Sequence, residues 1–258
     1  MTRRTDRRFA LLAGGGLALF FTFCVAFNVA AWSIGKVEGS THRVLTGSIK
    51  QLTVESSNGD VTILPSVDGK IHVNGRAEGT LHAPAPKIEV NGARVWVSAN
   101  CPVWGFGDCD SEVVVRVPTT TAIDVSSGSG DVVASDLAGG SRLNTSSGDV
   151  IVDGAAGDVT LESASGDVIA RGLRSQHALG KTSSGDVDLR FLSPPTDAVA
   201  ETASGDVRIL VPPGAQGYDA TTDTDSGDEA VGVRTDPDAD HRLRAETNSG
   251  DAVIDYGG

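Results

Sequence analysis

A Ser-Gly-Asp tripeptide recurs along the second half of the chain, and this repeat restricts the possible folds more than any other feature. Successive copies are 18, 18, 19, 20, 22 and 23 residues apart. A unit of this length cannot bury a core alone, whereas stacked units can share one. The repeat therefore predicts coils of about 18–23 residues that stack into a solenoid. The turn aspartates, including a looser first copy, are Asp60, Asp131, Asp149, Asp167, Asp186, Asp206, Asp228 and Asp251.

Polarity alternates around each turn, as it does along β-strands. In the first three copies the residue six before the turn aspartate is apolar, and in most copies so are the residues one and three after it, as in Leu143, Val150 and Val152. Hydroxyl residues stand four and two before it, and we expect both columns to face inward with the apolar residues, bonded from coil to coil. A Gly157-Asp158 pair marks a second turn, so one coil should hold two short strands. Glycine permits a positive φ and aspartate caps the turn, so neither residue requires a ligand.

The predicted fold is all-β: a parallel β-solenoid, resembling a β-helix or β-roll, over residues 48–258. Residues 122–258 hold the regular repeats. Residues 48–121 show strand patterns without the clean period, and we expect them to form irregular first coils.

The N-terminus has the pattern of a membrane anchor. Residues 9–34 contain no charged residue and follow four arginines, and about 20 helical residues are enough to cross a bilayer. We expect a cytoplasmic basic tail at 1–8, one transmembrane signal-anchor helix at 9–34 and a stalk at 35–47. The protein would then be a single-pass protein of the cell membrane with its bulk outside. A cleaved signal peptide is the alternative.

The charge of the remaining chain limits the choice of partners. Residues 36–258 contain 17 basic and 33 acidic residues, a net charge of −16. Such a domain repels polyanions, so nucleic acid is not an expected partner.

One irregular segment interrupts the strand patterns. Cys101 and Cys109 bracket it, and in an oxidising compartment we expect them to form a disulfide. Trp104 and Phe106 would then lie in a constrained loop, where aromatic side chains are good anchors for a partner. The alternative is that both rings cover an open end or side of the solenoid.

Residues with the spacing of a catalytic site are not apparent. The five histidines are scattered, and we find no nucleophile elbow, phosphate loop or His-Glu-x-x-His helix. We predict no enzyme activity and no cofactor. Two alternatives stay open, namely a carbohydrate-active β-helix enzyme and a calcium-binding β-roll, although the calcium-binding unit has a nine-residue period.

An apolar run from Val113 to Pro118, then Ile123-Asp124-Val125, then serial Ser-Gly-Asp-Val units resemble the DUF4097 family of β-strand-repeat proteins, often labelled adhesins. The resemblance covers about residues 48–258. It implies a bacterial envelope protein with a β-solenoid fold, and it supplies no catalytic residues. The expected function is surface binding, adhesion or envelope sensing, with an envelope protein or polysaccharide as partner.

Overall fold

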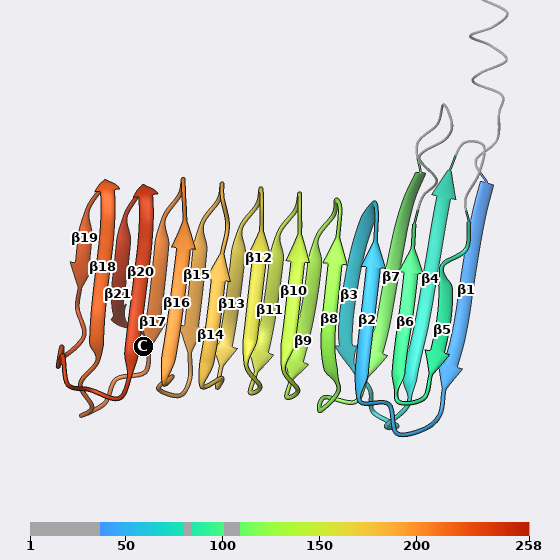
Figure 1. Ribbon diagram of the computed structural model, residues 1–258, viewed down its shortest axis with the longest axis horizontal. Helices are drawn as coiled ribbons and strands as arrows, with labels where there is room; N and C mark the ends of the chain where they lie inside the picture. The colour runs from blue at the N-terminus through green and yellow to red at the C-terminus, as the bar shows by residue number, and fades with distance from the viewer. Residues whose placement is uncertain (1–36, 80–83, 101–108, 258) are drawn as a thin grey trace, which may run out of the picture.

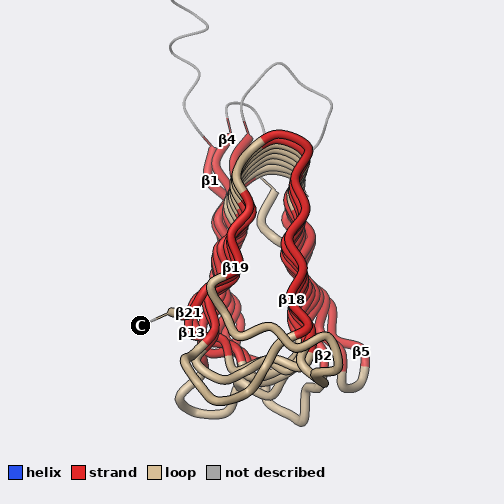
Figure 2. Tube along the Cα trace, turned by 90° about the vertical axis from the view of Figure 1, so that its left-hand side faces the viewer, coloured by secondary structure: helices blue, strands red, loops and turns tan. Residues whose placement is uncertain are grey.

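The computed structural model describes residues 37–79, 84–100 and 109–257, and every regular element within them is a β-strand. The strands form two long sheets, A and B, that face each other along the molecule (Figure 1; Figure 2). Sheet A contains, in spatial order, β1 (Val37–Leu45), β4 (Ile71–Gly79), β7 (Cys109–Val117), β3 (Gly59–Pro65), β9 (Val132–Leu137), β11 (Val150–Ala155), β13 (Val168–Leu173), β15 (Val187–Phe191), β17 (Val207–Val211), β21 (Ala252–Tyr256) and β19 (Glu229–Val231). Sheet B contains β18 (Asp219–Ser226), β20 (Arg242–Ser249), β16 (Asp197–Thr202), β14 (His177–Lys181), β12 (Val159–Ser163), β10 (Ser141–Thr145), β8 (Ala122–Ser127), β2 (Gln51–Ser56), β6 (Arg94–Ala99) and β5 (Lys87–Asn91).

One coil consists of a strand in sheet B, a Ser-Gly-Asp corner and a strand in sheet A. The corners lie together along one long edge of the molecule (Figure 1). Neighbouring coils pair in parallel, so that Leu143 of β10 aligns with Val125 of β8 and Leu161 of β12. All three side chains are fully buried. The all-β prediction is confirmed, and two long, mostly parallel sheets are the arrangement expected of a β-solenoid.

The order of the coils in space differs from their order in the sequence at both ends. The β20–β21 coil lies between β16–β17 and β18–β19. At the other end, β2–β3 lies between β6–β7 and β8–β9. The spacing of the repeat alone does not indicate this exchange of order. The physical reason at the C-terminal end is burial: β20 and β21 carry apolar inward residues, whereas β18 and β19 are polar and exposed and therefore suit a terminal position.

Three strands at the N-terminal end are antiparallel to their neighbours. β1 pairs with β4, β4 with β7 and β5 with β6. Only Gly92 and Ala93 separate β5 from β6, and Gly92 has φ of 61°. The two-residue hairpin imposes antiparallel pairing of β5 with β6, which is one reason why the period is lost here. Most of the expected stalk, residues 37–45, is strand β1 at the edge of sheet A.

The corner hydroxyls divide into two sets. The column four residues before the turn aspartate is inward and mostly buried, as in Thr145 and Thr182 at 1% and 2% exposure. The column two residues before is exposed in nearly every coil, as at Ser147 and Ser165. The expectation that both columns face inward is therefore wrong for the second. Strand alternation ends where the corner begins, so it no longer sets the direction of that side chain.

Candidate functional site

The eight turn aspartates form a hydrogen-bonded ladder along the corner edge. The carboxylate of every one except Asp228, which lies in the terminal coil, accepts a bond from the main-chain N–H of the aspartate in the adjacent coil, as Asp149 does from Asp167 at 2.8 Å. The same bond, at 2.8–2.9 Å, joins Asp60 to Asp131, Asp131 to Asp149, Asp167 to Asp186, Asp186 to Asp206, Asp206 to Asp251 and Asp251 to Asp228. These carboxylates thus link coils, and the geometry gives them a structural role.

The inward hydroxyls and the corner glycines complete this edge. Thr145 donates to the carbonyl of Gly130 in the adjacent coil at 3.0 Å, and Ser163 donates to that of Gly148 at 2.9 Å. A Cβ on Gly166 would lie 2.1 Å from the carbonyl oxygen of Gly148. The corners are therefore closely packed backbone with no space for a ligand between coils. No group of three or more histidine, cysteine or acidic residues within the described ranges could hold a metal ion.

One cluster combines serine, aspartate and histidine, but its geometry is not catalytic. Ser66 donates to Asp68 at 2.8 Å, and the His72 ring contacts the same carboxylate oxygen at 2.9 Å. In a nucleophilic triad the histidine lies between serine and carboxylate. Here the carboxylate is the centre, and the hydrogen bonds from His72, then Ser66, then the Lys70 main chain hold the pKa of Asp68 well below its ordinary value. The cluster stabilises the turn between β3 and β4.

The irregular segment predicted to carry a binding loop lies largely outside the described residues. Cys109 begins β7 and is disulfide-bonded. Its predicted partner Cys101, and the aromatic residues Trp104 and Phe106, are not among the described residues. The pairing and the role of the loop stay predictions.

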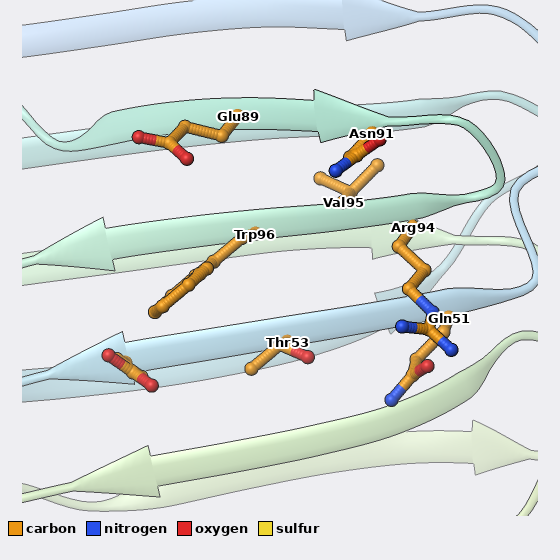
Figure 3. A pocket seen from close by; sticks show the side chains of 8 residues that line it. Gln51, Thr53, Glu89, Asn91, Arg94, Val95 and Trp96 are labelled. Atoms are coloured by element: carbon orange, nitrogen blue, oxygen red, sulfur yellow. The ribbon is translucent and has the colours of Figure 1, made fainter.

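The outer face of sheet B carries a hollow of about 400 Å³ beside an exposed tryptophan. Trp96 on β6 is 47% exposed, because Val95 and Val97 on either side point into the core. Its neighbours across the sheet are Glu89 on β5 and Thr53 on β2. Figure 3 shows the indole extending from β6 toward β2, over the gap between these two strands. The hollow is lined by Gln51, Thr53, Glu55, Glu89, Asn91, Arg94, Val95 and Trp96.

The polar groups of the hollow are arranged around the indole. Gln51 and Asn91 flank Arg94 in the cross-strand register, two residues along from the row of Trp96. In Figure 3 these three side chains lie at one end of the hollow, and Glu89 lies toward the other. Glu55 follows Thr53 by two residues on β2, so it points to the same outer face. The indole thus has carboxylates in one direction and amides with a guanidinium in the other.

Some charged side chains elsewhere on this face pair with one another. Lys181 contacts Glu201 at 2.8 Å and Arg244 contacts Glu246 at 3.3 Å. The polar side chains that line the hollow, by contrast, form no hydrogen bond or ion pair with any described residue. Their hydrogen-bonding groups are therefore available to a ligand. This difference separates the hollow from the paired region around Lys181 and Arg244.

Sequence reasoning placed Arg94 to Val97 in a strand but did not single out Trp96. The signal was present, because alternation with Val95 and Val97 fixes an outward direction for the indole. The sequence could not show which strands lie beside Trp96. β2 and β6 are paired although Thr53 and Trp96 are 43 residues apart, and this pairing depends on the exchanged coil order.

The model of the family described as Toastrack DUF4097 matches residues 49–257. The chain belongs to the DUF4097 family. The resemblance noted in the sequence is thereby confirmed, and the match spans the solenoid from β2 to β21. A comparison with curated proteins gives no match.

Two solved structures resemble this DUF4097 protein at low identity. One, from Clostridium sporogenes, is called a putative cell adhesion protein; it has 12% identity and a TM-score of 0.40, covering 86% of this chain and 100% of the other. The second, from Bacteroides fragilis, is called a putative adhesin; it has 14% identity and a TM-score of 0.48, covering 87% and 98%.

The predicted transmembrane segment at residues 9–34 lies outside the described residues. Within the part of the chain that the structure describes, no helix has the length and apolar character needed to cross a membrane.

Proposed function

We propose that this DUF4097 protein is a non-catalytic binding protein of the bacterial envelope, which captures its ligand on the outer face of sheet B at Trp96. The observation that carries the proposal is the half-exposed indole surrounded by polar side chains without partners among the described residues. Exposed tryptophan is costly to leave in water and is enriched at the centres of binding surfaces. Because Trp96 lies on a β-sheet, binding does not require a flexible loop to become ordered.

The rigidity of the site supports binding. Trp96 and Thr53 lie on paired strands whose inward residues Val95, Val97, Leu52 and Val54 are all at most 1% exposed. The backbone below the hollow is therefore held by the core, and a ligand need not order it. Preorganisation of this kind raises affinity by reducing the entropy lost on binding.

The position of the protein in the cell is part of the same proposal. An anchor at residues 9–34 with the N-terminus in the cytoplasm would tether the solenoid to the cell membrane and leave it outside. The net charge of −16 over residues 36–258 suits an exported, soluble domain. A cleaved signal peptide would release the domain instead, and the mass of the mature N-terminus distinguishes the two.

The test uses the purified full-length protein and an immobilised bacterial envelope fraction. We expect Trp96→Ala to reduce binding at least tenfold while the melting temperature stays within about 2 °C, because the side chain packs on the surface. Leu192→Ala, which removes another exposed apolar side chain at 57% exposure, is the matched control and should bind as the wild type does. Unchanged binding by Trp96→Ala would refute the proposal.

The same purified protein and envelope fraction test two alternatives, a binding site in the predicted loop and an enzyme activity. A Trp104→Ala, Phe106→Ala double variant tests the predicted loop, and loss of binding in this variant alone would move the site there. A carbohydrate-active enzyme would release soluble oligosaccharides from envelope or plant polysaccharides. We expect bound polymer without release.

A further inference from the structure

We infer that the ligand of the Trp96 hollow is an uncharged, linear polysaccharide that runs along the solenoid axis, across the strands of sheet B. This inference rests on the proposed function and adds the chemical class of the ligand and its direction. Four features carry it: the exposed indole, the mixture of unpaired donors and acceptors, the charge of the surface and a second hollow in line with the first.

The indole suits one face of a sugar ring. A pyranose presents C–H groups on its faces and hydroxyls around its rim, so it requires an apolar plate beside polar groups. Trp96 is 47% exposed and provides such a plate. An aromatic side chain buries a large apolar area with little loss of side-chain entropy.

The rim of the hollow suits hydroxyl groups. Glu55 and Glu89 only accept hydrogen bonds, Arg94 only donates, and the amides of Gln51 and Asn91 do both. A hydroxyl is both donor and acceptor, so a polyhydroxylated ligand can satisfy every one of these groups. A cationic peptide would serve the two carboxylates but oppose Arg94, and a polyanion would serve Arg94 alone.

The charge of the whole surface favours a neutral ligand. The two carboxylates and one guanidinium leave the hollow with a formal charge of only −1, within a domain that carries a net charge of −16 over residues 36–258. A field of this sign repels acidic polymers and attracts cations from solution. A neutral glycan avoids the repulsion.

A second hollow continues the first along the solenoid. It has a volume of about 290 Å³, shares Gln51 with the Trp96 hollow and includes Asp124, Arg142 and Thr160. The side chains of these three residues also form no hydrogen bond or ion pair within the described part of the chain. The two hollows therefore offer polar groups of the same kind to one ligand.

The register of sheet B places these residues in a single row. Trp96 aligns with Thr53, Thr53 with Asp124, Asp124 with Arg142 and Arg142 with Thr160. The row crosses five strands, and at a strand spacing of about 4.8 Å it is about 19 Å long. A row perpendicular to the strands lies along the solenoid axis. A linear chain of several sugar rings fits this row better than a branched or compact ligand.

The experiment measures binding of the full-length protein by calorimetry to defined probes. These are uncharged linear glucan, mannan and galactan oligosaccharides of two, four and six residues, polygalacturonate and oligolysine. We expect affinity for at least one neutral series to rise tenfold or more from the disaccharide to the hexasaccharide. Trp96→Ala should abolish binding at every length. Arg142→Ala should weaken the hexasaccharide about tenfold and leave the disaccharide unchanged.

Arg171→Ala, which alters an exposed arginine on the other sheet, is the control and should change nothing. Affinity independent of length, or equal loss at all lengths in Arg142→Ala, would overturn the direction of the ligand. Binding only to oligolysine or polygalacturonate would overturn its class. If Trp96→Ala no longer binds the envelope fraction, but the wild-type protein binds no neutral glycan, the proposed function stands and this inference fails.

Discussion

The main-chain N–H of Asp251 donates a 2.9 Å hydrogen bond to the carboxylate of Asp206, 45 residues earlier in the sequence. The intervening Asp228 bonds instead to Asp251, from the far side. The corner ladder therefore follows the order of coils in space. Because the entropic cost of closing a loop grows only slowly with its length, a coil can be inserted out of sequence at little expense when its residues suit the position.

Two features should make the corner glycines irreplaceable, namely their positive φ and their close contact with the backbone of the adjacent coil. Gly166 has φ of 135°, and a Cβ there would lie 2.1 Å from the carbonyl oxygen of Gly148. We expect Gly166→Ala to lower the free energy of unfolding by about 3 kcal/mol or more, measured by urea denaturation and circular dichroism. Gly69→Ala is the control: φ is 71° but nothing lies within 4 Å, so about 1 kcal/mol should be lost. Equal losses in the two variants would contradict the packing argument.

The aspartate ladder should tolerate loss of charge better than loss of the acceptor. Asp186 accepts from the Asp206 N–H at 2.8 Å. Neighbouring unit charges about 4.8 Å apart in water repel by about 0.9 kcal/mol. Asp186→Asn keeps an acceptor oxygen and relieves this repulsion, so we expect equal or greater stability at low salt, with the gain shrinking as salt screens the ladder. Asp186→Ala leaves the N–H unpaired and should cost about 1–3 kcal/mol.

Melting temperatures at about 10 mM and about 1 M salt check both variants. If Asp186→Asn is as unstable as Asp186→Ala, the ladder requires its negative charge. A bound cation would create such a requirement.

The sequence revealed the coil because the corner requires glycine for packing, an aspartate for the ladder and a hydroxyl for the adjacent carbonyl. Thr145, Gly148 and Asp149 each make a contact that repeats in nearly every coil, so the pattern is visible. The exchanged order could not be predicted, because alternative stackings of coils would satisfy the same corner contacts. The Trp96 hollow depends on that order and was missed for the same reason.

Asp136 should be replaceable by glycine with a gain in stability. It is the one described non-glycine residue with positive φ, at 53°, and Gly154 and Gly172 stand at the same place in the next two coils. A non-glycine residue in this region costs about 1 kcal/mol. We expect Asp136→Gly to raise the free energy of unfolding by about 0.5–1 kcal/mol by urea denaturation. Ser135→Gly, one residue earlier in the strand, should instead lower it; a loss in both variants would refute the strain.

Tyr218 should make the protein sensitive to alkali. Its side chain is fully buried, which raises its pKa, although Gln216 donates to its hydroxyl at 2.8 Å. The folded state holds this proton more tightly than the unfolded chain, whose tyrosine pKa is about 10. Stability is therefore unaffected below about pH 10 and falls as pH rises toward the folded pKa. We expect Tyr218→Phe to have a free energy of unfolding about 1 kcal/mol below that of the wild type at about pH 8, because it loses one hydrogen bond. Between about pH 8 and about pH 11 its free energy of unfolding should fall less than that of the wild type. Parallel curves for Tyr218→Phe and the wild type would exclude Tyr218 as the titrating group.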